Sequence, residues 1–150
     1  MLVPNLAVTA LLLAREGRRR EAAAVLEELL ALCAGGRLPY FAAPAVLWAA
    51  AELGRAAELD PLARREEGNR WLEAVAAGSA GDFAEAHALF AEIGLAADAA
   101  EAAAHAAAQL LDRGDRIGAD EMLAAARGFF RQVGATRRLR ATDALLSATA

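Results

Sequence analysis

The sequence predicts an all-α protein of antiparallel helical hairpins, and three observations lead to that prediction. Alanine, the residue with the highest helix propensity, supplies 44 of the 150 residues. Valine, isoleucine and threonine, which favour strands, are scarce. A glycine turn of one composition recurs along the chain. We expect about eight to nine helices, stacked as a right-handed solenoid in a single domain over residues 1–150.

The recurring turn sets the expected period. Three times a glycine is followed by alanine after five residues and by a large apolar residue after nine. The copies are Gly17–Ala22–Leu26, Gly81–Ala86–Phe90 and Gly114–Ala119–Leu123. Glycine can end a helix in the left-handed conformation, and the alanine allows a paired helix to approach closely. Repeats of roughly 30 to 40 residues with two helices each indicate a helical solenoid.

Glycines and capping residues mark the expected helix ends. Asp82 is a candidate cap whose box Glu85 completes, and Asp98 with Glu101 is a second candidate box. The stretch 35–44, with two glycines and two prolines, is a candidate soft point. The expected helices are 5–15, 18–33, 42–53, 56–66, 69–79, 82–93, 97–113, 116–133 and 137–148. The expected breaks include Gly17, Gly54, Gly68, Gly81, Gly94, Gly114 and Gly134.

Charge and composition exclude several kinds of site. All 16 basic residues are arginine, so the chain has neither a Schiff-base lysine nor a phosphate-loop lysine. The net charge is −4, but residues 66–126 carry −9 and residues 127–150 carry +4. An acidic chain is a poor general nucleic-acid binder. The basic end would suit an acidic partner or the acidic middle of the same chain.

Neither cysteine chemistry nor targeting signals are expected. Cys33 is the only cysteine, so there is no internal disulfide and no cysteine metal cluster. Arginines follow the apolar run 6–14 rather than precede it, the reverse of a signal peptide. The uncharged stretch LPYFAAPAVLWAAA is too short to span a bilayer and contains two prolines. We therefore expect a cytoplasmic protein without membrane association, cofactor or metal.

Polar residues on the helix 97–113 are candidate partner contacts. Glu101, His105 and Gln109 lie one turn apart on one face. They form either a solvated stripe or part of a concave contact surface. A second histidine, His87, is expected to be packed or half-buried between aromatic neighbours. The two histidines lack the helical spacing of metal ligands.

Arginines at the start of the last helix are the second candidate contact. Arg137, Arg138 and Arg140 stand where cations oppose the helix dipole. They carry the alternative hypothesis, a nucleic-acid-binding module of a transcriptional regulator. Among the aromatic residues, Trp48 and Trp71 are expected to be packing anchors. The pair 40–41 beside the soft point is more suggestive of a contact.

One stretch resembles a known repeat. GDFAEAHALF is similar to the opening of the second helix of a tetratricopeptide repeat. The first-helix signature is absent, because Ala74 and Ala77 stand where glycine and tyrosine are usual. The resemblance implies a divergent, tetratricopeptide-like array. The matching residues are Gly81, Asp82, Phe83, Ala86 and Phe90.

A longer resemblance covers about residues 50–150. This region is similar to the C-terminal helical region of large bacterial regulators. In these, a cyclase or DNA-binding domain accompanies a signalling ATPase, and FFRQVGATRRLR is the most specific piece. The resemblance implies a regulatory, partner-sensing role and brings no catalytic residues, since no GxxxxGK[ST] motif is present.

Together these features predict a non-catalytic scaffold for protein–protein or interdomain regulation. It would form the C-terminal part of a larger signalling ATPase or regulator, with a protein partner in cis or in trans. We expect neither an enzyme nor, as the main role, a nucleic-acid binder. A homodimer would form through the N-terminal helix, whose apolar residues are Leu2, Val3, Leu6 and Leu11.

Overall fold

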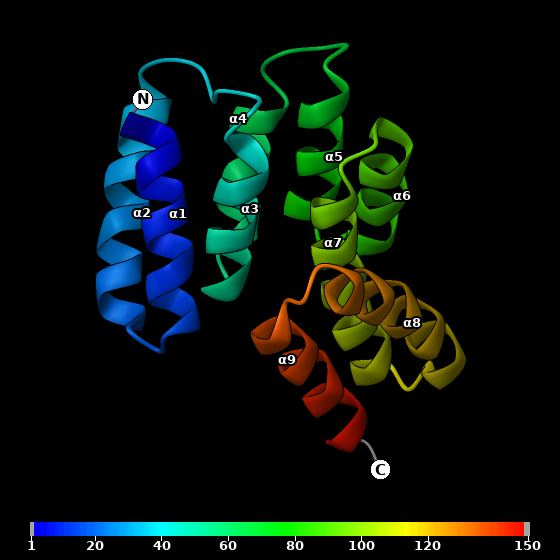
Figure 1. Cartoon of the computed structure of the whole chain (residues 1–150). Coiled ribbons are helices and arrows are strands. Elements are labelled where there is room, and N and C mark those ends of the chain that lie inside the picture. The colour runs from blue at the N-terminus through cyan, green and yellow to red at the C-terminus, as the bar shows by residue number, and fades with distance from the viewer. Residues whose placement is uncertain (1, 149–150) are drawn as a thin grey trace. The chain divides into compact units, whose positions relative to one another are not determined.

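All regular structure in the part of the chain that the structure describes is helical. The computed structural model describes residues 2–148, which form nine α-helices and one short 3₁₀ helix, and this confirms the all-α class (Figure 1). The helices are α1 (Leu2–Arg15), α2 (Arg19–Ala34), α3 (Ala43–Glu52), the 3₁₀ helix η1 (Ala56–Leu59), α4 (Asp60–Ala63), α5 (Arg70–Ser79), α6 (Phe83–Ile93), α7 (Ala96–Asp112), α8 (Arg116–Gln132) and α9 (Thr136–Ser147).

Prolines account for two differences from the expected helices. The single helix expected at 56–66 is instead η1 followed by the four-residue α4, with Pro61 in the first turn of α4. Pro61 has no N–H to donate, so a helix cannot run through it unbroken. At the other end, α1 begins at Leu2 rather than at residue 5. Pro4 lies in its first turn, where a missing N–H breaks no helical hydrogen bond.

The two expected capping boxes have different outcomes. The Asp82 carboxylate accepts a 3.0 Å hydrogen bond from the Glu85 N–H, so Asp82 caps α6. The box of Asp98 with Glu101 was wrong, because α7 begins at Ala96 and its N-cap is Leu95. Alanine propagates a helix readily, so α7 extends past the expected cap. Asp98 instead lies in the first turn, where its charge complements the helix dipole.

The expected glycine breaks all fall outside the helices, six of them within two residues of the last residue of a helix and Gly68 in the turn between α4 and α5. All seven of the single glycines named as breaks have positive φ. Gly114 shows the pattern: its φ is +80°, its N–H donates to Leu111 O at 3.0 Å, and the next N–H, of Asp115, donates to Leu110 O at 2.9 Å. These two bonds form a Schellman cap, which satisfies carbonyls at the end of α7.

The small and large residues of the repeated turn are buried in every copy. Their exposed fractions lie between 0% and 2%. The large member supplies buried apolar area one turn after the small one. Both positions therefore lie in the core, while the close approach of a paired helix at the small residue stays a prediction. The buried pairs are Ala22 with Leu26 in α2, Ala86 with Phe90 in α6, and Ala119 with Leu123 in α8.

The chain divides into two compact units, Met1–Gly81 and Asp82–Ala150. In the first unit α1 packs against α2 and α3, and α3 packs against α5 and η1. The candidate soft point at 35–44 lies inside this unit. The Arg65 guanidinium stabilises its start, donating to the carbonyls of Cys33, Ala34 and Gly36 at 3.4, 3.3 and 3.0 Å. Arg65 thereby donates to carbonyls at and just beyond the end of α2, of which that of Cys33 also accepts the Gly36 N–H at 3.2 Å.

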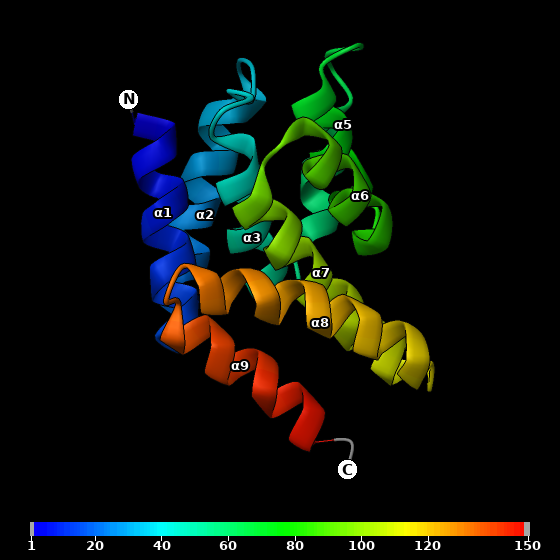
Figure 2. The same cartoon turned by 45° about the vertical axis from the view of Figure 1, so that its right-hand side comes forward.

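In the second unit each helix packs on the next. The succession α6, α7, α8 and α9 is visible in Figure 2. One cluster of its core combines alanines of α7 with Phe130 of α8, which is 3% exposed. Leu139 of α9 packs against this cluster. No described helix has both the length and the apolar character that crossing a bilayer requires.

Candidate functional site

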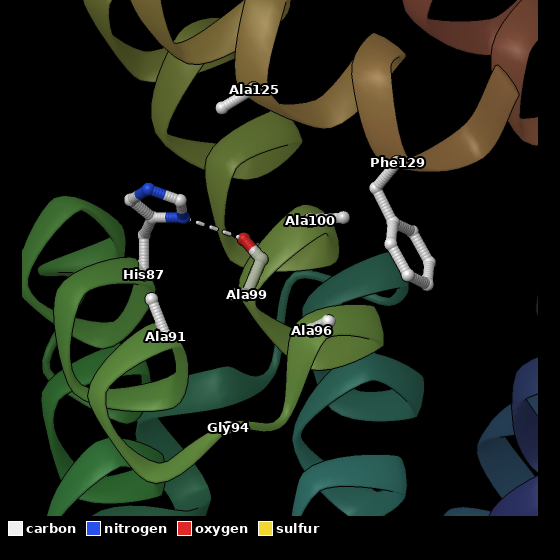
Figure 3. Close-up of a pocket in the computed structure, with 8 residues that line it drawn as sticks. All are labelled: His87, Ala91, Gly94, Ala96, Ala99, Ala100, Ala125 and Phe129. Carbon is white, nitrogen blue, oxygen red and sulfur yellow. Dashed lines mark hydrogen bonds between the residues drawn. The ribbon is translucent and has the colours of Figure 1, made fainter. Parts of the chain in front are cut away.

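An open pocket of about 230 Å³ lies on the second unit, between α6, α7 and α8 (Figure 3). Two features of the sequence produce it. Gly94, with φ of +90°, turns the chain tightly, so the start of α7 lies beside the end of α6. Alanines then line the walls and leave the space between helices unfilled. The lining residues are His87, Ala91, Gly94, Ala96, Ala99, Ala100, Ala125 and Phe129.

His87 provides the polar side chain of the pocket. It is half-buried, as expected, and its Nδ1 lies 2.8 Å from the main-chain oxygen of Ala99 (Figure 3). A carbonyl oxygen only accepts hydrogen bonds, so Nδ1 carries the proton and donates. In the neutral ring, Nε2 is then an acceptor. It makes no hydrogen bond within the described residues.

The three predicted contact residues of α7 are largely packed within the second unit. Glu101 is only 9% exposed, and its carboxylate accepts two hydrogen bonds from Arg138. The His105 ring stacks on Phe83, with centroids 4.9 Å apart. Gln109 is half-buried. The stripe is therefore not a solvated one, and its first two members contact other helices of the unit.

The three predicted arginines of α9 separate into two environments. Arg138 is half-buried: it pairs with Glu101, and its guanidinium carbon lies 5.4 Å from the centroid of the Phe130 ring. Arg137 and Arg140 are exposed. The sequence predicts all three near a helix start, but nothing in it indicates that the Arg138 side chain packs inward.

An aromatic cluster lies beside the 35–44 stretch of the first unit. The Tyr40 ring meets Phe41 and Trp71 edge to face, at centroid distances of 5.7 and 5.5 Å. Phe41 is 60% exposed, whereas Trp48 of α3 is buried, as expected of a packing anchor. Trp71 is half-buried and also packs. Tyr40 and Phe41 are exposed, so the cluster reaches the surface.

The exposed apolar side of α1 differs from the expected one. Of the four residues expected there, Leu2 is exposed and Val3, Leu6 and Leu11 are half-buried. Val8 and Leu12 are exposed instead, at 49% and 53%. The difference arises because Ala7, Ala10 and Ala14 form the buried side and fix the rotation of the helix. Dimerisation through α1 stays a prediction.

Reactive groups are few elsewhere in the structure. Cys33 is 1% exposed, and its burial raises the pKa of the thiol, an effect that Arg65 partly offsets. Within residues 2–148 no group of three or more histidine, cysteine or acidic side chains is arranged to hold a metal ion. The His87 pocket is therefore the strongest candidate for a binding site.

Comparison with protein-family models, curated proteins and solved structures finds no match for this chain. The resemblance to tetratricopeptide arrays and to bacterial ATPase regulators therefore rests on the quoted residues alone and stays a prediction. What the chain does must be argued from its own geometry.

Proposed function

We propose that this chain is a non-catalytic helical-repeat module that binds a protein partner through the His87 pocket of its second unit. The observation that supports this most is the pocket itself. Three consecutive helices contribute to it, and its walls are small and apolar, with the imidazole of His87 as the polar side chain. Apolar pockets with a few placed polar groups are typical of ligand-binding sites.

The pocket lacks the groups that catalysis would require. A hydrolytic site needs a nucleophile beside a base, or a metal, close to donors that stabilise developing charge. Around His87 the lining contains alanine, glycine and one phenylalanine, with no acidic, hydroxyl or thiol side chain. An imidazole without such neighbours can accept a hydrogen bond and position a ligand.

The wider setting of the module is part of the proposal. The helices of each unit would continue a tetratricopeptide-like, right-handed solenoid, with the three buried turn motifs as its repeats. The array would form the C-terminal part of a larger signalling ATPase or regulator in the cytoplasm. Its partner would then be another domain of the same protein or a separate protein.

Nucleic-acid binding is the weaker alternative. It depends on Arg137, Arg138 and Arg140 acting together. The middle one is paired with Glu101 and is 19% exposed at its side chain, so two arginines are left for phosphate contacts. Affinity that rests on phosphate contacts grows with the number of cations that reach the backbone.

Site-specific photo-crosslinking tests the proposed function. A photoreactive residue at Ala125 points into the pocket, whereas the same residue at Ala124 is exposed on α8 but does not line it. In the protein as the cell makes it, we expect a protein adduct, in cis or in trans, from position 125 and not from position 124. Equal adducts from both positions, or none from 125, would contradict the proposal.

A further inference from the structure

The end of the second unit concentrates arginines, and three of them have no internal partner. From residue 122 to residue 142 the chain carries five arginines and no acidic residue. Arg127 forms an ion pair of 2.8 Å with Asp143. Arg138 pairs with Glu101. The others are exposed, and their side chains form no hydrogen bond or ion pair within residues 2–148; they are Arg131, Arg137 and Arg140.

The Arg127–Asp143 pair indicates that these arginines gather at one end of the α8–α9 hairpin. The two helices run in opposite directions from the tight turn that joins them (Figure 2). Arg131 lies one helical turn from Arg127, and Arg140 lies one helical turn from Asp143, both toward that turn. Arg137 lies a further helical turn toward the start of α9. All three therefore flank the turn.

An exposed apolar side chain lies in the same turn. Val133 is 55% exposed. The N–H of Gly134 donates to Arg131 O at 3.2 Å, so the turn is tight and keeps Val133 close to the arginine at the end of α8. An apolar centre with a polar and charged rim is the usual composition of a protein–protein interface.

The positions of Arg137 and Arg140 are unfavourable within the chain itself. The two like charges lie three residues apart and are neighbours on the surface of α9. Arg137 also lies in the first turn, where the helix dipole repels a cation. No carboxylate of the described residues pairs with either arginine. An anionic partner would offset both costs, and residues that disfavour the local structure are typical of functional sites.

The composition of this surface favours a protein segment over a nucleic acid. Three cations supply few phosphate contacts. The chain carries −4 overall and −9 over residues 66–126, which repels a long polyanion. Guanidinium groups also bind carboxylates through paired hydrogen bonds. Val133 offers a contact to an apolar side chain of a peptide and none to a phosphate.

We propose that Arg131, Val133, Arg137 and Arg140 form a docking surface, the α8–α9 surface, for an acidic protein segment. Carboxylates of the segment accept hydrogen bonds from the arginines, and an apolar side chain between the carboxylates packs on Val133. None of the four residues lines the His87 pocket, so this inference does not rest on the proposed function.

Matched peptides test the carboxylates. One peptide consists of Glu-Leu-Glu-Glu repeats, and the other has glutamine in place of every glutamate, with the same length and leucines. Fluorescence anisotropy measures the binding of each labelled peptide to the full chain at several salt concentrations. We expect the glutamate peptide to bind about tenfold more tightly than the glutamine peptide at low salt. Its affinity should fall as salt rises, because salt screens exposed charges.

Two double variants separate the α8–α9 surface from the general charge of the chain. Arg137→Glu with Arg140→Glu should weaken the glutamate peptide by about tenfold or more. Glutamate is favourable near a helix start, so this variant should fold, which circular dichroism checks. Arg20→Glu with Arg113→Glu makes the same change of net charge at two other exposed arginines and should leave the affinity almost unchanged.

A third variant tests the apolar centre. Val133→Ser should weaken the glutamate peptide by about threefold, because the leucine loses its apolar contact. Binding of a DNA duplex would not depend on this side chain. Tighter binding of the duplex than of the glutamate peptide, lost on reversal of Arg137 and Arg140, would overturn the inference in favour of nucleic acid.

The remaining outcomes separate this inference from other occupants and from the proposed function. Equal affinity for the two peptides, or equal losses in the two double variants, would overturn it. Salt-sensitive self-association without peptide binding would overturn it in favour of a second copy of the chain. Ala125→Leu fills the His87 pocket and should leave the glutamate peptide unaffected. Loss of peptide binding in that variant would place the peptide in the pocket and overturn the inference, whereas failure of crosslinking at position 125 would leave it standing.

Discussion

The guanidinium of Arg138 and the carboxylate of Glu101, 37 residues apart in the chain, share two hydrogen bonds of 3.0 and 2.6 Å. The pair joins α9 to α7. Their side chains are 19% and 12% exposed, so water competes with the pair only weakly. The face of the Phe130 ring stabilises the arginine further. Thr142 is the buried residue of α9, and the pair is one of the contacts that join this helix to the rest of the unit, beside the Arg127–Asp143 ion pair and the packing of Leu139.

Removing one member of this pair should destabilise the fold. In Glu101→Ala, the arginine remains largely buried without its partner, so we expect the free energy of unfolding to fall by about 2 kcal/mol. Arg138→Met should cost a similar amount. The measurement is urea denaturation followed by circular dichroism.

The double variant and a neighbouring arginine serve as controls. Glu101→Ala combined with Arg138→Met should cost less than the sum of the two single changes, because the second change breaks no further bond. Arg137→Met, an exposed neighbour, should change the free energy of unfolding by less than about 0.5 kcal/mol. Full additivity of the two single variants would show that the pair is not energetically coupled.

Two glycines of similar exposure should respond to alanine in opposite directions. Gly114 has φ of +80°, and a Cβ there meets nothing within 4 Å. An alanine at this position would therefore destabilise the fold through backbone strain and not through a clash. We expect Gly114→Ala to lower the free energy of unfolding by about 1 kcal/mol. Gly128 lies inside α8 with equally open surroundings. Gly128→Ala should raise the free energy of unfolding by about 0.5 to 1 kcal/mol.

Thermal denaturation of the two alanine variants checks the contrast. Gly114→Asn is the matched control at the turn, because asparagine tolerates the left-handed conformation better than alanine does. It should be more stable than Gly114→Ala. A stabilising effect of alanine at both positions would mean that the left-handed turn is not needed to end α7.

The sequence predicted the local structure of this chain well, and the reason is physical. Helix ends depend on neighbouring residues, so glycine at positions such as 81 and 114 and a cap such as Asp82 can be recognised from the chain alone. Burial of the +5 and +9 residues follows from helical spacing. The prediction of a cap at Asp98 was wrong because the alanines before it favour an earlier helix start. The two local features therefore predicted different first residues for α7.

The candidate site could not be predicted in the same way. The pocket is a space that several alanines leave empty, and which of them face one another depends on how three helices pack. The sequence shows the aromatic neighbours of His87. It does not show the hydrogen bond from His87 to the main-chain oxygen of Ala99, 12 residues further along the chain. Likewise, the sequence shows that Arg138 is a cation near a helix start, but not that it pairs with the distant carboxylate of Glu101. Contacts across helices require the tertiary structure.

Cys33 should be slow to react in the folded protein. It is 1% exposed, and burial raises the pKa of its thiol, so both access and the thiolate fraction are reduced. We expect iodoacetamide to modify it at neutral pH much more slowly in buffer than in denaturing urea, as measured by mass spectrometry. Rapid labelling without urea would show that the end of α2 opens readily.

The raised pKa of the Cys33 thiol predicts that the folded protein loses stability in alkali. Because the folded-state pKa lies above the unfolded one, Cys33 contributes stability that is complete below the unfolded pKa and is lost as pH rises through the folded pKa. Cys33→Ser should reduce this alkaline dependence. Titration of the free energy of unfolding from neutral to alkaline pH compares the two proteins, and identical curves would contradict the assignment.

Arg55 should make stability depend on pH on the acid side. Its guanidinium donates hydrogen bonds to Glu58 at 2.5 and 2.9 Å and to Glu27 of α2 at 3.2 Å. The bonds from Arg55 lower the pKa of Glu58. A carboxyl whose pKa is lowered by folding contributes stability above its unfolded pKa, and that contribution is lost as pH falls through the folded pKa.

Neutral replacements measure this contribution. We expect Glu58→Gln to flatten the fall in stability between neutral and acid pH, with a small effect because the carboxylate is 45% exposed. Arg55→Gln should flatten it in the same direction, and the double variant should add little to either. Urea denaturation at a series of pH values gives the slopes. A slope in Glu58→Gln equal to that of the unmodified chain would mean that the Arg55 bonds do not persist in solution, where water competes for both groups.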